Sequence, residues 1–586
     1  PSVTLADDGV SDDDDAQFDA QIWSFAVSGS GSGNVAGAGS LSLNWIRNDI
    51  QAYIADGATA NATTNGKKVD VRAKDMSTIN ALAGAGSGAG TAAIGASVAY
   101  NYIGGDPDNP GSDTESTIKA YIHNATVNAD SVNVNANSSS DINNISFAGG
   151  GAGTFAGSGS LSLNWIRKDI DARITGSSVD STDNIIVFAD DTSGMHSIAA
   201  QANGAGVVAV GAAIAYSDIE NNINAGIDAG SDVTVANSPD GSRAGNVVIK
   251  ALSAAEIETV AVSISGSGTA ALAGSGGGSL INNRINAFIS GSTVATPDSV
   301  VVFANSNDTI ASYGGSAGLS GTVGIGGSVF INKLSSETKA YVSLDSTVTA
   351  LGAHSADVDY WADNGDSTDV TYSANQAVFG LAVVANTAND IDVISAAAGA
   401  SGVVGIAANV ISNIVETTAE AYISDSSVNS NNERGATVRV MAHQQTDIES
   451  AGGAVAGGQV GVGAAVDLNV INNTTKAYIS DDDRLTDTAE NQDHIFANDV
   501  HVVALSDEAV RSVVVGASIG LYFGGTGVGA TIVSTSNTNA FIRFSANGFN
   551  SGATNLTFSG ELISNSITFS ETSNNISGRT KTSNSV

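Results

Sequence analysis

The chain has 586 residues with 68 Gly, 5 Pro and no Cys, and its formal net charge at pH 7 is −37. This charge disfavours nucleic acid and anionic membranes as partners, and the lack of Cys excludes disulfides, thiolate metal sites and a cysteine nucleophile. Aromatic residues are 5% and charged residues 14% of the chain, and enrichment in Val, Thr, Asn and Gly predicts strands joined by tight turns, with few helices.

Residues 1–22 form an acidic N-terminal segment. It contains DDGVSDDDD from Asp7 to Asp15 and starts at Pro1 without a signal-peptide pattern, so we expect a processed chain or part of a longer one. Closely spaced carboxylates can bind calcium. Candidate ligands here and in later acidic loops are Asp12, Asp13, Asp14, Asp106, Asp108, Asp363, Asp366, Asp481 and Asp482. They match neither the EF-hand spacing nor a calcium-binding nonapeptide, so solvated loops are the simpler interpretation.

From residue 23 to 545 the chain is a series of repeats. The segment GAGSLSLNWIRNDIQAYI, from Gly37 to Ile54, returns almost unchanged as GSGSLSLNWIRKDIDARI from Gly157 to Ile174. A shorter Ala-aromatic-Ile type step, called here the AYI step, occurs nine times, mostly 52 to 63 residues apart, and defines about nine units. Its copies begin at Ala52, Ala120, Ala172, Ala225, Ala287, Ala340, Ala421, Ala477 and Ala540.

Each unit contains further strand-like elements. One alternates apolar and polar residues and ends in Ala, as in VDVRA from Val69 to Ala73. Another is a Gly/Ala-rich run, such as Gly88 to Ser97, whose nearly bare face allows close approach of a neighbouring backbone. After it comes a segment ending in Asn, at Asn44, Asn101, Asn164, Asn332 and Asn413. We expect about four short strands per unit, with insertions near 104–114, 343–395 and 481–493.

These units predict an all-β repeat fold. A single unit is too thin to bury its apolar face, so the units must stack into one continuous rod. The leading interpretation is an elongated β-solenoid, similar to a parallel β-helix, with about two coils per unit and a length on the order of 90 Å. The alternative is a continuous antiparallel β-sandwich of stacked repeat units, because SGAG from Ser87 to Gly90 could form a turn.

Residues 546–586 depart from the repeat pattern, as expected of a segment that caps the stack or joins it to another subunit. Two short strand-like segments in it could complete the sheet of the next subunit. The residues predicted to join subunits are Asn555, Leu556, Thr557, Phe558, Ile567 and Phe569.

Little in the sequence suggests catalysis. G-x-S-x-G occurs at Gly314 to Gly318 and at Gly516 to Gly520, but chance matches are expected in a Gly- and Ser-rich chain, and the motif needs a strand-turn-helix with His and Asp partners. The six His residues show no metal-ligand spacing. We therefore expect no enzyme activity and no cofactor other than Ca²⁺.

The ordered AYI, VxVxA and Gly/Ala-rich elements resemble the repeat region of large bacterial filamentous adhesins, of the leukotoxin-type and haemagglutinin-like β-strand-repeat surface proteins. The resemblance covers nearly the whole chain. It implies a secreted protein that is displayed at the cell surface.

The sequence thus predicts an extracellular structural and adhesive surface protein, a rod or fibre subunit that assembles end to end through head-to-tail contacts. Its partners would be further copies of itself and a glycan or protein on a host or neighbouring cell. No apolar run reaches the ~18 residues of a membrane-spanning helix, so no transmembrane span is expected. The alternatives are a surface lattice or sheath protein and a β-helix polysaccharide-active enzyme, which the 22 Lys and Arg residues disfavour.

Overall fold

The fold is all-β. The computed structural model describes residues 2–3, 17–18, 20–63, 66–105, 115–236, 245–363, 370–429, 435–480 and 495–543, together with the short strands at 549–551, 555–559, 561–563, 567–569 and 575–579. Strands make up 85% of the structure, and no helix occurs in these ranges. This confirms the sequence-based expectation of strands and turns.

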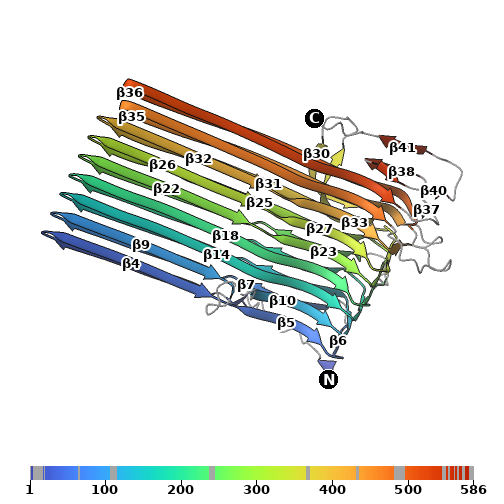
Figure 1. The fold of residues 1–586 in the computed structure, drawn as a ribbon. Coiled ribbons are helices and arrows are strands. Elements are labelled where there is room, and N and C mark those ends of the chain that lie inside the picture. The colour runs from blue at the N-terminus through green and yellow to red at the C-terminus, as the bar shows by residue number, and fades with distance from the viewer. Residues whose placement is uncertain are drawn as a thin grey trace.

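Successive repeats pair with one another in parallel, so that each repeat forms one layer of a stack (Figure 1). The AYI steps lie in register, with Ala52 opposite Ala120 and Ala120 opposite Ala172. This AYI ladder consists of β5 (Asp49–Ala55), β10 (Ser116–His123), β14 (Phe155–Thr175), β18 (Val208–Asp228), β23 (Arg284–Ser290), β27 (Glu337–Ser343), β33 (Thr418–Ser424), β35 (Gly435–Ser480) and β36 (Ala497–Arg543).

One detail differs from the sequence-based expectation, and the strand pairings favour its parallel interpretation over the sandwich alternative. Each unit supplies one layer and not two coils, so a nine-layer stack is only about 40 Å high, whereas the 21 residues of β14 alone span about 70 Å. Antiparallel pairing, which the sandwich alternative requires, is confined in the described ranges to β29 (Ala356–Asp363) and β30 (Val370–Val378). The number of coils per unit was wrong because alternation along a strand does not reveal which strand lies beside it.

At one end of each layer, three ladders enclose an apolar core. Besides the AYI ladder, one is a sheet of short strands and the other holds the VxVxA-type strands. The short strands are β1 (Ser2–Val3), β6 (Thr59–Ala62), β11 (Thr126–Ala129), β15 (Ser178–Ser181), β19 (Asp232–Val235), β24 (Thr293–Thr296), β28 (Ser346–Ala350) and β34 (Ser426–Val428). The VxVxA-type strands are β2 (Gln17–Phe18), β7 (Lys68–Asp75), β12 (Ser131–Ser138), β16 (Ile185–Asp191), β20 (Val247–Ser253), the first parts of β25 (Val300–Ser320), β31 (Gly380–Ser401), β35 and β36, and then β38 (Asn555–Ser559) and β41 (Asn575–Arg579).

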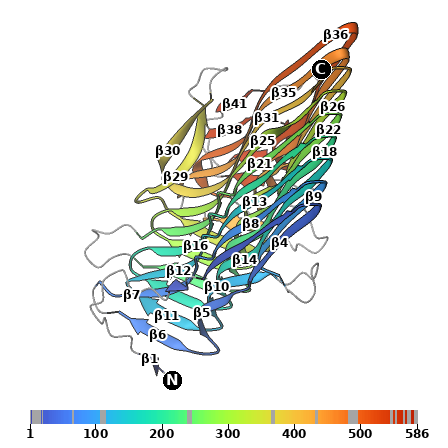
Figure 2. The ribbon, with the colours of Figure 1, turned by 90° about the vertical axis from the view of Figure 1, so that its left-hand side faces the viewer.

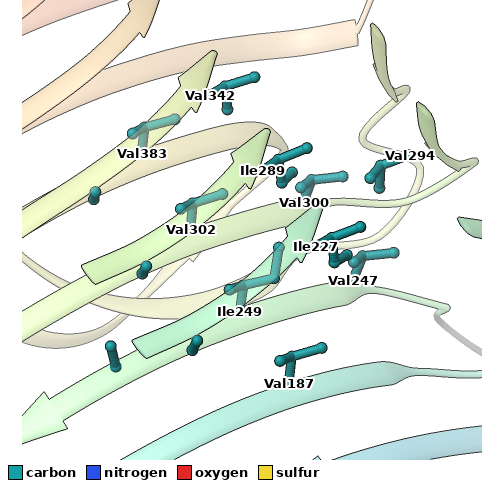
Figure 3. Packing of buried hydrophobic residues seen from close by; sticks show 14 of the residues in the cluster. Val187, Ile227, Val247, Ile249, Ile289, Val294, Val300, Val302, Val342 and Val383 are labelled. Carbon is teal, nitrogen blue, oxygen red and sulfur yellow. The ribbon is translucent and has the colours of Figure 1, made fainter. Parts of the chain in front are cut away.

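The core between these three ladders consists of Val, Ile and Ala. Figure 3 shows Ile227 and Ile289 of the AYI ladder facing Val247, Val300 and their neighbours from the VxVxA-type strands. All four side chains are fully buried. Because each position repeats in every layer, the same contact recurs along the stack and forms one continuous core.

The rest of each layer is a long arm made of two facing sheets, which run side by side in Figure 2. One sheet contains β3 (Gln21–Ser32), β8 (Thr78–Ala89), β13 (Asp141–Ala152), β17 (Gly194–Ala205), β21 (Glu256–Ser267) and the later parts of β25, β31, β35 and β36. The other contains β4 (Val35–Ile46), β9 (Ala92–Ile103), β14, β18, β22 (Ala270–Ile281), β26 (Val323–Leu334), β32 (Val404–Val415), β35 and β36.

The two sheets of the arm approach closely because small residues face inward. A Cβ atom on Gly326 of β26 would overlap the carbonyl oxygen of Ala398 in β31. At the tip of the arm, a Cβ on Gly206 would overlap the carbonyl oxygen of Gly153 in the adjacent layer. The close approach expected from the Gly/Ala-rich runs is therefore present.

Short strands follow the last layer. β38 pairs in parallel with Asp499–Val503 of β36, and β39 (Glu561–Ile563) pairs with Phe541–Arg543. β37 (Phe549–Ser551) pairs with β40 (Ile567–Phe569).

Candidate functional site

Most of the predicted calcium ligands lie outside the described residues. These are Asp12, Asp13, Asp14, Asp106, Asp108, Asp366, Asp481 and Asp482. Asp363 is the last residue of β29, and its side chain is not among those described. Within the described ranges, no group of three or more His, Asp or Glu residues could hold a metal ion. Calcium binding at the acidic loops stays a prediction.

The predicted subunit-joining residues lie in two different strands. Asn555, Leu556, Thr557 and Phe558 belong to β38, which extends the VxVxA-type ladder of the same chain. Ile567 and Phe569 belong to β40, which pairs with β37. β41 then pairs in parallel with β38. These strands add rungs after the last layer, and their role between subunits stays a prediction.

The G-x-S-x-G matches lie inside strands. Ser316 is in β25, opposite Ser263 of one neighbouring layer and Ala397 of the other, and Ser518 is in β36. The motif requires a sharp turn between a strand and a helix to expose the serine, and neither site has one. Among the histidines, His443 is buried, and burial lowers its pKa to about 3, so its ring is neutral at pH 7.

A column of buried polar side chains runs through the stack where the arm meets the three-ladder end. It separates the core of the three ladders from a second apolar core inside the arm. Lys168 and Asp75 form an ion pair in this column, and both side chains are fully buried. Asn48 Nδ2 donates to Asp75 Oδ1 at 2.9 Å, and Lys168 Nζ donates to Ser138 Oγ at 2.9 Å. We call this set the buried polar column.

Two further carboxylates, Asp191 and Asp308, occupy other layers of the buried polar column. Burial raises the pKa of both, while the Lys168 charge opposes the rise at Asp191 and hydrogen bonds from Ser336 and Ser306 oppose it at Asp308. Asn221 Nδ2 donates to Asp191 Oδ2 at 2.7 Å, and Ser306 Oγ donates to Asp308 Oδ2 at 2.8 Å. The hydrogen bonds within the column fix the register of the layers. Because the groups are sealed from solvent, the column offers no reaction site.

The sequence analysis missed this column, although a signal was present. In a strand, alternate residues face the same side. Lys168 therefore faces the same side of β14 as Ile166 and Ile170, which are both fully buried. A charged residue on the apolar side of a strand therefore indicated a buried ion pair.

The Asn residues that end the repeat segments form a second buried ladder, the asparagine column. Asn44 Nδ2 donates to Asn101 Oδ1 at 2.7 Å, and Asn101 Nδ2 donates to Asn164 Oδ1 at 2.8 Å. The same bonds join Asn332 to Asn413 and Asn413 to Asn469, each at 2.8 Å. Asn101 and Asn413 thus each donate to the next layer and accept from the one before it, and Ser217 and Ser279 occupy this position in the two layers between Asn164 and Asn332.

The aromatic residues of the AYI steps stack outside the core. The rings of Tyr53 and Tyr121 lie 5.1 Å apart, and a continuous stack follows at 4.9 to 5.3 Å through Phe288, Tyr341, Tyr422, Tyr478 and Phe541. Trp45 stacks on Tyr102 of the next layer at 4.7 Å. Trp165, which holds the same place in the repeated segment, packs against Tyr100 and Tyr216 of the layers on either side, so these aromatic residues join neighbouring units.

A shallow groove lies on the outer face of the arm over its first four layers. Its volume is about 320 Å³, and it runs across β3, β8, β13 and β17. Its lining residues are Trp23, Phe25, Asn80, Ala81, Leu82, Asn143, Asn144, Ile145, His196 and Ile198. We call it the Trp23 groove.

Comparison with known proteins adds no assignment. No family model matches the chain, and no curated protein or solved structure matches it. None of the described segments is a helix with the length and hydropathy needed to traverse a bilayer.

Proposed function

We propose that this chain is a β-solenoid with a structural and adhesive role at the surface of a cell, as its resemblance to filamentous adhesins implies. The supporting observation is the register of its repeats. Nine AYI steps lie in one parallel ladder, from β5 to β36, without a shift of a single residue at the Ala position. Backbone hydrogen bonds then link all layers into one body, and buried side-chain columns add bonds between many of them, which suits a load-bearing element.

End-to-end assembly is the second part of the proposal. β36 pairs with β35 along one edge. Along its other edge, a strand in the described ranges pairs only with Asp499–Val503 and Phe541–Arg543, and the rest of this edge has no paired strand in those ranges. The arm tip of this layer exposes Ile519, Leu521 and Tyr522, with 76%, 83% and 82% of their surface accessible. An unpaired edge next to an apolar tip favours addition of a further strand, which a second copy of the chain could supply.

Electron microscopy of the purified chain tests this assembly. We expect rods or filaments joined along the stacking direction, and fewer of them when the residues after Ser545 are deleted. Leu521→Lys keeps the complete chain and places a charge at the exposed edge, so it should also reduce assembly. Assemblies that survive both changes would show that this end does not join subunits.

A further inference from the structure

The Trp23 groove combines features that suit one class of ligand. Two columns of side chains line it, each with one residue per layer. Trp23, Asn80, Asn143 and His196 lie opposite one another in successive strands, as do Phe25, Leu82, Ile145 and Ile198. The groove therefore runs across the layers, with a polar wall after Trp23 and an apolar wall after Phe25.

Two exposed rings form one end of the groove. The side chains of Trp23 and Phe25 are 64% and 66% exposed, and their ring centres lie 6.3 Å apart with planes inclined by 22°. Aromatic faces carry partial negative charge, and the C–H groups on the face of a pyranose ring carry partial positive charge. The two ring planes are thus nearly parallel, and the exposed faces of the rings offer a surface on which a sugar face can stack.

The polar wall supplies hydrogen bonds beside this platform. Asn143 Nδ2 donates to Asn80 Oδ1 at 3.2 Å. A side-chain amide has two N–H donors and an oxygen with two lone pairs, so this bond uses only part of the capacity of each residue. Vicinal sugar hydroxyls act as donor and acceptor at once and match such amides.

The charge around the groove selects between neutral and acidic sugars. Its one titratable lining residue, His196, lies 3.0 Å from Glu258 Oε2 through Nδ1. The chain as a whole carries a formal charge of −37. Uronic or sialic acid carboxylates would be repelled, whereas a neutral saccharide has no electrostatic penalty.

We infer that the Trp23 groove binds a neutral saccharide, with a sugar ring stacked on Trp23 and Phe25 and hydroxyls bonded to Asn80 and Asn143. A cavity of this size is at the lower end of known ligand sites. Because adjacent layers are about 4.8 Å apart, a linear glycan can meet one pair of lining residues per layer as it crosses the strands. This inference deepens the proposed adhesive role and rests on it.

Titration of the purified chain with neutral oligosaccharides tests the site. Cello-, xylo- and galacto-oligosaccharides are the probes, polygalacturonate is the acidic comparison, and tryptophan fluorescence and calorimetry are the readouts. We expect at least one neutral probe to bind, Trp23→Ala to weaken its affinity at least tenfold, and Asn143→Ala to weaken it several-fold. The matched control is Tyr53→Ala, which removes an aromatic residue of 59% exposure from a different ladder and should leave affinity unchanged.

Three outcomes would overturn the inference. The first is that no neutral probe binds, and the second is that the wild type and Trp23→Ala bind a probe equally well. The third is that Trp23→Ala loses self-association in sedimentation, which would make the groove a contact between copies of the chain. Circular dichroism must show that each variant keeps its strand content. Filament formation measured on the same samples separates the two proposals, since a Trp23→Ala chain that assembles normally leaves the structural role intact.

Discussion

Replacing Asn413 by Ala should break the asparagine column in its middle. Asn413 Oδ1 accepts from Asn332 Nδ2, and Asn413 Nδ2 donates to Asn469 Oδ1, each at 2.8 Å. All three side chains are fully buried. Alanine therefore leaves one donor and one acceptor without these partners in the interior, and each orphaned group costs roughly 1–3 kcal/mol. We expect the free energy of unfolding to fall by about 2–4 kcal/mol.

Urea denaturation followed by circular dichroism measures this loss, and Asn128→Ala is the control. Asn128 Nδ2 donates to Asn61 Oδ1 at 2.8 Å in an equivalent bond between layers, but at the surface, where water replaces the partner. The control should lose less than about 1 kcal/mol. Amide hydrogen exchange should also accelerate in β26, β32 and β35 of the Asn413 variant. If both variants lose the same stability, burial of the column does not matter and the reasoning is wrong.

Three further predictions concern buried charge and close packing. Lys168→Met should destabilise the fold by about 3–5 kcal/mol at neutral pH, because it leaves the buried Asp75 carboxylate without its positively charged partner. Adding Asp75→Asn should restore part of the lost stability in denaturant titrations. Burial raises the pKa of Asp308, so its contribution to stability is greatest below the ordinary Asp value of 3.8 and is lost as pH rises through the folded-state pKa. Asp308→Asn should therefore become more stable relative to wild type as the pH is raised from about 4 to 7, and a pH-independent difference in melting temperature would contradict this. Gly326→Ala should cost about 1–3 kcal/mol by forcing the two sheets of the arm apart, whereas the neighbouring Gly327→Ala, whose Cβ would meet nothing within 4 Å, should be neutral or slightly stabilising in thermal melts.

The candidate groove could be recognised only in part from the sequence. Trp23 is one of only four Trp residues in the chain, but Asn80, Asn143 and His196 are more than 50 residues away from it along the chain. Parallel register brings these residues into one column. Which residues of different repeats become neighbours depends on the number of residues in each turn and loop, which alternation within a strand does not encode.

The sequence by itself determined that this protein is an all-β repeat protein, because period-two alternation and turn residues reflect local backbone geometry and recur in every unit. Only the tertiary structure decided that one unit makes one layer and that neighbouring layers run parallel. It also decided that Lys168 is buried against Asp75. These features depend on contacts between residues far apart in the chain, where the burial of a whole ladder outweighs the preference of any single strand.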